Sequence, residues 1–411
     1  MKRISSIATT VAILGAWLLA AEAAGPLTLA TSVLLGSRAH DLVLDVGRSD
    51  HCLSAPPCDF AHVVTDVGLS VVDITQRTAP VVRGSVNLGG RGFGLDRQGS
   101  LVFVASERAG LKVVDVSDPD EPVVVGSRPI PGSGGARDVA VKADADAGGG
   151  AVALGGVVYV ASWPGELFVI RHSRPAPTAA NPRPPVTLTP IRTIGILAWG
   201  LNNTNDAAYL AKMNQYVTVG SAKISGVSIT GNTLVTLDFT WGRLVFYDVA
   251  RADDPIFKGT HAAPFMFRAE VHPAGAVAYG FAASSAKSGI YSYPIDLLNP
   301  NASTRFDICA ACDYFKSPPT DYGGFGISSN GRYVIFLAGK QGVIQVINVS
   351  DPSNMVDDCE VNGAVAPCSL PIVGHGIKSS EPMGAQTLGD YIFAAVGNLG
   401  FRVYSYHGIS N

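Results

Sequence analysis

Histidine, tyrosine and arginine side chains offer the sharpest catalytic hypothesis in this sequence. His40, His261 and His375 all fall at positions that the repeat pattern described below assigns to one face of the molecule. Three imidazoles could hold a metal ion. Alternatively, a histidine or Tyr322 could move protons in β-elimination on a uronic-acid polysaccharide, while arginine neutralises the sugar carboxylate. The histidines show no His-x-His or HExxH spacing, so we predict no metal ligands and leave catalysis as an alternative.

A second set of polar side chains could bind an anionic ligand. Arginine pairs suit two-point capture of a carboxylate, sulfate or phosphate group, and a tryptophan could stack on a sugar ring. The candidate ligand-binding residues are Arg91, Arg137, Asp138, Arg268, Glu270 and Trp199. One alternative stays open, because Asp41, Asp138 and Glu270 are interleaved with these arginines. The acidic and basic side chains could pair with one another in a ring of charges that only stabilises the fold.

The six cysteines form three close pairs in the sequence: Cys52 and Cys58, Cys309 and Cys312, and Cys359 and Cys368. In an exported protein such an even, locally paired set predicts disulfides, here three that each close a short loop. The spacing of Cys309 and Cys312 is also that of a redox dithiol. That alternative is weaker, because the pair is predicted to lie in a loop and not at the start of a helix. We predict no cofactor.

The chain that carries these candidate residues also contains a phrase of sequence that recurs along its length. Residues 110–127 read GLKVVDVSDPDEPVVVGS, which predicts an apolar β-branched strand, a turn and a second strand. Pro119 and Pro122 interrupt the hydrogen-bond ladder at the turn. Related phrases start at positions 69, 111, 167, 244, 290, 343 and 401. Seven copies of a unit built from short strands predict a propeller or a linear array of small sheets.

The phrase resembles a known repeat. LKVVDVSDPDEPVVVGS at 111–127 is similar to the LVIVD repeat of exported bacterial and archaeal β-propeller proteins, as are residues 69–84 and 343–352. The resemblance implies an all-β fold, a seven-bladed β-propeller that covers roughly residues 26–408. It implies no activity, because the repeat residues build strands and turns and the family has no shared catalytic signature.

Each blade of such a fold needs four antiparallel strands, lettered A to D from the central channel outward. The repeated phrase supplies strands C and D. In the second unit we expect strand A at 92–95 and a turn at 96–99. The last unit ends near Tyr406 without a D strand, whereas residues 26–37, PLTLATSVLLGS, look like a D strand that lacks a C strand. We therefore predict that the N-terminal strand completes the last blade and closes the ring.

Strand direction sorts the connections onto two faces. The D–A and B–C connections share one face, and the A–B and C–D connections share the other. Insertions at 197–222, 309–322 and 361–382 are all expected to be D–A connections, which would crowd one mouth of the channel. The proline-rich residues 175–185 are expected to form an extended, solvent-facing C–D excursion.

Composition supports this fold and disfavours some functions. The chain has 411 residues, of which 46 are glycine and 26 are proline, and only 15% are charged. Many short apolar segments separated by glycine and proline suit an all-β protein. The net charge is −3 without a basic run, so we expect no nucleic-acid partner. We also expect no membrane insertion, since no stretch beyond the N-terminus is long and apolar enough.

The N-terminal residues predict export. Lys2 and Arg3 precede an apolar run from Ala8 to Ala20, and Ala21-Glu22-Ala23 is a signal-peptidase site of the A-x-A type. The expected domains are a signal peptide at 1–23 and one β-propeller at 24–411. The expected location is secreted or periplasmic.

The sequence thus favours a binding scaffold over an enzyme, without deciding the question. The expected ligand is a protein partner or an anionic glycan, held by loops at one channel mouth, and the protein is expected to be a monomer. The first alternative is a polysaccharide lyase or hydrolase at the same mouth. The second is a redox-accessory protein that uses Cys309 and Cys312.

Overall fold

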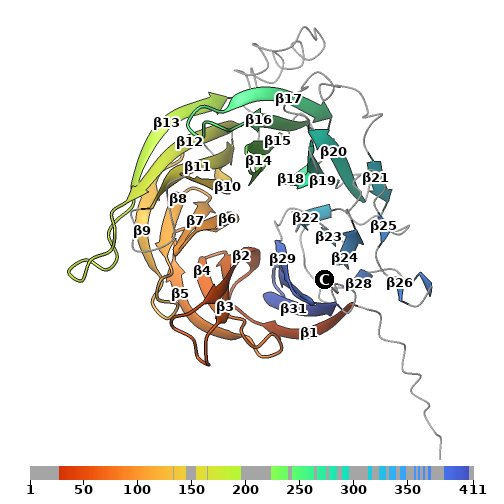
Figure 1. The fold of residues 1–411 in the computed structure, drawn as a ribbon, viewed down its shortest axis with the longest axis horizontal. Coiled ribbons are helices and arrows are strands. Elements are labelled where there is room, and N and C mark those ends of the chain that lie inside the picture. Colours follow the sequence, from red (N-terminus) through yellow and green to blue (C-terminus); the bar gives the residue numbers. More distant parts are fainter. Residues whose placement is uncertain are drawn as a thin grey trace, which may run out of the picture.

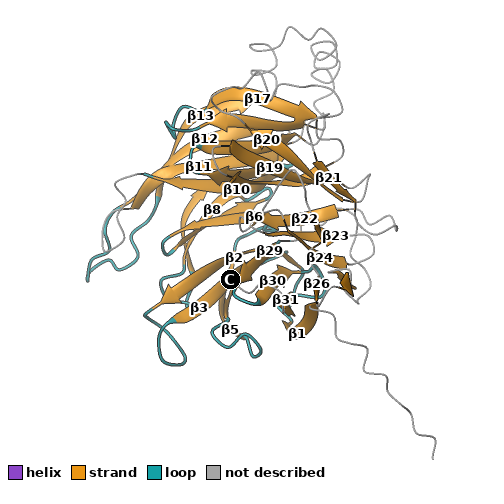
Figure 2. Ribbon diagram, turned by 45° about the vertical axis from the view of Figure 1, so that its right-hand side comes forward, coloured by secondary structure: helices purple, strands orange, loops and turns teal. Residues whose placement is uncertain are grey.

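The chain folds into a ring of β-sheets (Figure 1). The computed structural model describes residues 27–132, 134–144, 154–163, 165–195, 224–238, 243–262, 266–274, 277–284, 289–295, 313–316, 324–329, 333–338, 343–348, 356–357, 360–361, 364–365, 369–371 and 384–406. Within these residues every regular element is a strand, which confirms the all-β prediction (Figure 2). Seven sheets of four or five antiparallel strands account for all but one pair of short strands in this part of the chain.

The first three sheets each use four consecutive strands. Sheet 1 holds β2 (Ala39–Arg48), β3 (Cys58–Thr65), β4 (Gly68–Asp73) and β5 (Val81–Asn87). Sheet 2 holds β6 (Gly94–Gln98), β7 (Leu101–Ser106), β8 (Gly110–Asp115) and β9 (Val123–Arg128). Sheet 3 holds β10 (Gly135–Ala143), β11 (Leu154–Trp163), β12 (Glu166–Arg174) and β13 (Thr187–Gly195).

The remaining sheets are more varied. Sheet 4 holds β14 (Ile224–Thr230), β15 (Thr233–Asp238), β16 (Arg243–Asp248) and β17 (Ile256–Ala262), and sheet 5 holds β18 (Met266–Ala274), β19 (Val277–Ser284), β20 (Gly289–Ile295) and β21 (Asp313–Lys316). Sheet 6 holds β22 (Gly324–Ser329), β23 (Tyr333–Ala338), β24 (Val343–Asn348), β25 (Val356–Asp357) and β28 (Ser369–Pro371). Sheet 7 holds β29 (Ala385–Leu388), β30 (Tyr391–Ala395), β31 (Phe401–Tyr406) and β1 (Leu27–Val33), while β26 (Glu360–Val361) and β27 (Ala364–Val365) pair separately.

The innermost strands are in contact all the way around the ring. β2 touches β6, and the contacts continue through β10, β14, β18 and β22 to β29, which touches β2 again. Figure 1 shows the same strands around the centre, with β5, β9, β13 and β17 at the rim. The A strands therefore line the central channel, as the lettering of strands in the sequence predicted.

The hydrophobic core lies between neighbouring sheets. The apolar residues of strands B and C are buried on both faces of each sheet, because every sheet is covered by one neighbour on each side. Val71 of sheet 1 and Val104 of sheet 2 belong to one such cluster, and Val63 of sheet 1 joins Phe393 of sheet 7 in another. The outer strand β5 is mostly exposed. This difference explains why the C strands carry the strongest apolar signal in the sequence.

The aspartate that ends strand C has a structural role that recurs in three sheets. One carboxylate oxygen accepts the amide two residues later, at 2.9 Å for Asp73, 2.7 Å for Asp115 and 2.9 Å for Asp248. The other oxygen faces a cation: Arg83, Arg174 and Lys258 respectively. The repeated aspartate therefore shapes the C–D turn and forms an ion pair with a basic side chain. Both roles are structural.

The N-terminal strand completes the last sheet, as predicted. β1 pairs antiparallel with β31, with Leu27 opposite Tyr406 and Val33 opposite Phe401. The Oγ atoms of Thr28 and Ser405 are 2.6 Å apart. Leu27 is 4% exposed and packs in a cluster with Ile344 of sheet 6, so the first strand contributes to the core as well as to the ladder.

Several sequence-based expectations about strands and loops are wrong. In sheet 2 the turn expected at 96–99 begins only at Gly99, and Asp96 to Gln98 continue the strand as β6. The polar residues 96–98 concealed a strand because its side chains face the channel and the neighbouring sheets, where carboxylates accept backbone amides. Asp96, for example, accepts the amides of Arg97 at 2.7 Å and Val141 at 2.8 Å.

Two of the three insertions are not simple D–A connections. β21 is the outer strand of sheet 5 and lies inside 309–322, so Cys309 and Cys312 precede strand D in the sequence. In sheet 6 both β25 and β28 pair with β24, and β28 lies inside 361–382. The outer strand there is interrupted, and Cys359 and Cys368 fall in the sequence between its two parts. These short outer strands lack the repeated phrase and have few apolar residues. They could therefore not be predicted from the sequence.

The proline-rich excursion is mostly exposed and is anchored at its base. Residues 177–182 are exposed, and Thr178 and Asn181 exchange backbone hydrogen bonds across the tip at 3.0 and 3.1 Å. Its base is attached to sheet 2, where the buried Val186 donates its amide to Val125 at 2.8 Å and Arg183 donates to the carbonyl of Glu121 at 2.7 Å. Residues 175–185 are thus mostly solvent-facing, as predicted, and Pro184 is buried where the segment returns to the edge of β9.

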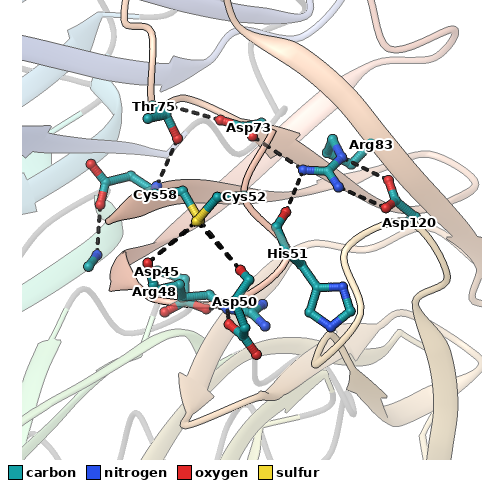
Figure 3. The surroundings of a disulfide bond; sticks show 12 residues. Asp45, Arg48, Asp50, His51, Cys52, Cys58, Asp73, Thr75, Arg83 and Asp120 are labelled. Carbon is teal, nitrogen blue, oxygen red and sulfur yellow. Dashed lines mark hydrogen bonds and ion pairs between the residues drawn. A yellow bond between two sulfur atoms is a disulfide. The ribbon is translucent and has the colours of Figure 1, made fainter. Parts of the chain in front are cut away.

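The predicted disulfide between Cys52 and Cys58 is present, with Cα atoms 5.5 Å apart (Figure 3). It closes the connection between β2 and β3, which rests on the C–D turn of sheet 2. Arg83 donates to both carboxylate oxygens of Asp120 at 2.7 Å and to the carbonyl of His51 at 2.9 Å. The other two cysteine pairs lie outside the described residues. No helix in the described part of the chain is long and apolar enough to cross a membrane.

Candidate functional site

Backbone bonds between sheets at one face of the ring bring polar loops together. The amide of Gly92 donates to Thr65 at 3.0 Å, and that of Ala136 donates to Glu107 at 2.9 Å. Each bond joins the entry of an A strand to the end of strand B, or the turn after it, in the preceding sheet. At Gly135, φ is +64° and an added Cβ would lie 2.0 Å from the carbonyl oxygen of Glu107, so only glycine allows this approach. The D–A and B–C connections therefore share one mouth, as predicted.

We define the mouth cluster as the polar and aromatic side chains gathered there by sheets 1 to 3. Its members are Arg38, His40, Asp66, Arg91, Phe93, Glu107, Arg137 and Trp163. His40 and Arg137 lie at β-bulges, where the register of strands A and B shifts between Ala39 and Asp41 and between Ala136 and Asp138. A bulge leaves its extra residue out of the ladder and re-aims the side chain.

Asp66 is the centre of the first half of the mouth cluster. Its Oδ2 accepts Arg38 Nε at 2.7 Å, while its Oδ1 lies 2.8 Å from His40 Nε2 and 2.9 Å from Arg91 Nε. Partial burial by itself would raise the pKa of Asp66, but the hydrogen bonds from Arg38 and His40 hold that pKa below its ordinary value. Asp66 is thus a carboxylate surrounded by three basic side chains.

Arg137 is the centre of the second half. Its guanidinium carbon lies 3.8 Å from the centre of the Trp163 ring and 4.3 Å from that of Phe93. Its nearest carboxylate is Glu107, at 3.7 Å. Burial lowers the pKa of Arg137 to about 10, with Glu107 opposing this shift and the nearby charge of Arg91 adding to it. Arg91 stacks on Phe93 as well, at 5.6 Å. Two cations therefore share one aromatic ring.

Three aspartates of the innermost strands line the channel. Asp41, Asp96 and Asp138 border a cavity of about 160 Å³ together with Ser228 and Gln386. Asp138 accepts the amides of Val139 at 2.9 Å and Val227 at 3.0 Å. Enclosure in the channel raises the pKa of Asp96 to about 6. Asp41 likewise accepts the amide of Leu42 at 2.9 Å, and the self-paired ring of charges stays a prediction for these residues.

The other predicted site residues divide into two groups. The backbone of His261 belongs to β17, and the backbone of Arg268 and Glu270 belongs to β18. His375, Tyr322 and Trp199 lie outside the described residues, as does the insertion at 197–222. Among the residues that the structure describes, no group of three or more histidine, cysteine, aspartate or glutamate side chains could hold a metal ion.

Sequence reasoning found Arg91, Arg137 and His40 but missed Asp66, Glu107 and Phe93 as their partners, and it favoured blade packing as the role of Trp163. Asp66 and Glu107 are on B–C turns, Phe93 immediately precedes β6, and Trp163 ends β11. A signal was present, because B–C turns of one unit and D–A connections of the next were already assigned to the same face. Pairing the charges of those two loops would have suggested Asp66 beside Arg91 and Glu107 beside Arg137.

Comparisons with known proteins agree with this architecture. Residues 58–88 and 98–128 match the family model of the LVIVD repeat. The crystal structure of the WD40 beta propeller domain of Doa1 is similar, with a TM-score of 0.53 and 9% sequence identity over 93% of this chain and 97% of that one. That of the computationally designed Ika8 protein has a TM-score of 0.46 and 10% identity over 92% and 99%. No curated protein sequence matches. The likeness to the WD40 propeller shows a shared fold alone.

Proposed function

This chain is an LVIVD-repeat β-propeller protein, and we propose that it is a seven-bladed, exported binding scaffold whose mouth cluster holds an anionic group of a protein partner or glycan. The observation that carries the proposal is the state of Arg137. Its guanidinium is held against two aromatic rings, its nearest carboxylate is 3.7 Å away, and within the described residues its buried Nε has no hydrogen-bond partner. A pre-positioned cation with unfilled donors favours an incoming anion.

The geometry of His40 favours a scaffold over a lyase or hydrolase. Its side chain is fully buried, and its Nε2 is held by Asp66. A general acid or base must reach the proton of a bound substrate, and this imidazole is enclosed within the protein instead. The redox alternative rests on Cys309 and Cys312, which lie outside the described residues.

Export is part of the proposal and rests on the N-terminal sequence. A leader cleaved after Ala23 would place the mature N-terminus just before β1, which begins at Leu27. Expression in a bacterial host, followed by cell fractionation and N-terminal sequencing, would test this. Retention of the first 23 residues, or a protein confined to the cytoplasm, would contradict it.

A binding assay with three polyanions tests the proposed function. Polygalacturonate, polyglutamate and dextran sulfate are titrated against the protein by calorimetry at low and high ionic strength. At least one should bind, more weakly at high salt, and the double variant Arg91→Gln, Arg137→Gln should weaken binding by about tenfold or more. Arg192→Gln serves as the matched control, because Arg192 lies in the outer strand β13 and pairs with Asp254 at 2.6 Å. Absence of binding, or equal binding by the double variant, would refute the proposal.

A further inference from the structure

Arg91 and Arg137, two neighbouring cations of the mouth cluster, are only partly neutralised by nearby carboxylates. The guanidinium carbons of Arg91 and Arg137 lie 5.6 and 4.3 Å from the centre of the same Phe93 ring, and the two positive charges repel each other. Arg91 forms an ion pair with Asp66, and the same carboxylate also pairs with Arg38 and His40. Glu107, the carboxylate nearest to Arg137, is one-third exposed. An anion placed between Arg91 and Arg137 would relieve this repulsion.

Asp66 shows which anion these donors accept. It is a carboxylate on a short side chain: its Oδ2 accepts Arg38 Nε at 2.7 Å, while its Oδ1 lies 2.8 Å from His40 Nε2 and forms an ion pair with Arg91 Nε at 2.9 Å. These partners are planar groups, two guanidiniums and an imidazole. Planar donors of this kind match the two coplanar oxygens of a carboxylate. The chain thus already contains one example of the group that its mouth can bind.

The depth of the site limits how that carboxylate can be carried. The side chain of Arg137 is only 13% exposed and is covered on its faces by Phe93 and Trp163. A uronic-acid carboxylate is fixed directly to a bulky sugar ring, so it approaches a guanidinium with so little exposed surface less readily. The carboxylate of glutamate or aspartate stands on a narrow, flexible stem that can enter.

We infer that the mouth cluster binds glutamate or aspartate side chains of an acidic segment in a protein partner, with Arg91 and Arg137 as the principal contacts. This inference rests on the proposed binding role and names the partner chemistry. Glu107 competes for the same guanidinium, so it sets the affinity: a ligand carboxylate must displace it or share Arg137 with it. Removal of that competitor should therefore strengthen binding, the opposite of what loss of a structural ion pair would do.

The test compares three short labelled probes of matched charge and length by fluorescence anisotropy: an oligoglutamate peptide, an oligogalacturonate and a sulfated oligosaccharide. Oligoglutamate should bind about tenfold or more tightly than the other two. Arg137→Gln should weaken oligoglutamate binding by about tenfold or more, whereas Glu107→Gln should strengthen it severalfold. Arg192→Gln should leave it unchanged.

Each outcome decides a different question. Tighter binding of the galacturonate or the sulfated probe, or equal binding of all three, would overturn the inference and leave the proposed anion-binding scaffold intact. Binding to none of the probes would remove the proposed function itself. Should Arg137→Gln fail to fold, Glu107→Gln still decides, because unchanged or weaker oligoglutamate binding in that variant would contradict the role given to Glu107 and Arg137.

Discussion

At the scale of single residues, the repeated aspartate shows how one side chain can serve both local and long-range structure. Asp73, Asp115 and Asp248 each cap a C–D turn with one oxygen and face a cation with the other. The surroundings differ sharply between copies. Asp115 and Arg174 are almost completely buried, and Arg174 comes from the next sheet, whereas Asp248 and Lys258 are each about one-quarter exposed and lie in one sheet.

This difference predicts unequal effects of the same substitution. Asp115→Ala should lower the free energy of unfolding by about 3 kcal/mol or more, because it leaves the guanidinium of Arg174 buried without its counter-charge. Asp248→Ala removes an equivalent cap and a partly solvated ion pair, so it should cost about 1 kcal/mol. Urea unfolding of the two variants beside the wild type would measure both. Equal losses would show that the turn cap, and not the buried pair, dominates.

His172 should make the fold sensitive to mild acid. Its ring is fully buried against Phe103, with ring centres 4.8 Å apart, and burial lowers the pKa of His172 to about 4. The unfolded chain, with a histidine pKa near 6.5, binds a proton first as the pH falls. Stability from this group is therefore complete above pH 6.5 and is lost as the pH drops toward 4.

His172→Phe removes that titration and keeps an aromatic ring in the same place. The variant should lose less stability than the wild type between pH 6.5 and 4, as measured by urea unfolding across this range. It should not lose stability at neutral pH, since within the described residues neither ring nitrogen of His172 has a hydrogen-bond partner. Parallel loss of stability in both proteins would contradict the assignment.

At the scale of elements, the first strand is held by its buried side as much as by its ladder. Leu27 is 4% exposed, whereas Leu29, two residues along the same strand, is 45% exposed. The two leucines thus provide a matched pair in one element. Both stand in register with β31, opposite Tyr406 and Tyr404, so substitutions separate side-chain packing from strand pairing.

Leu27→Ala should lower the free energy of unfolding by about 2 kcal/mol or more, because it opens a cavity between sheets 6 and 7. Leu29→Ala should change it by no more than about 0.5 kcal/mol. Thermal and urea unfolding of both variants provide the measurement. A large effect at Leu29 would mean that its side chain is covered in solution, and a small effect at Leu27 would mean that the first strand contributes little to the core.

Elements with a strong apolar phrase could be predicted from the sequence, and elements without one could not. The C strands beginning near Leu69, Leu111 and Leu244 were located because their side chains are buried on both faces of a sheet. β6, β21 and β28 were missed or misplaced because polar channel-facing residues or very short ladders define them. For the mouth cluster, Arg91 and Arg137 could be predicted from their place at or just before the start of strand A, but Asp66 and Glu107 depend on contacts between sheets.

At the scale of the whole molecule, neighbouring sheets are joined through side chains as well as through their apolar faces. Lys142, at the end of β10, donates to the carbonyl of Val249 in the next sheet at 2.6 Å, and Arg48, at the end of β2, donates to that of Val116 at 2.9 Å. Gln386 Oε1 accepts the amide of Leu44 at 3.0 Å across the closing junction. At these three junctions, side-chain hydrogen bonds therefore add to the packing of the apolar faces.

The pairing of the first and last strands has a mechanical consequence. Leu27 stands opposite Tyr406, so the outward-leading ends of β1 and β31 lie at the same edge of sheet 7. A tension applied between the two termini would load that ladder one rung at a time, as in peeling, and would not strain all rungs together. The pairing of β1 with β31 can thus resist heat and still separate under a small force. This junction is where we expect the ring of sheets to open when the termini are pulled apart.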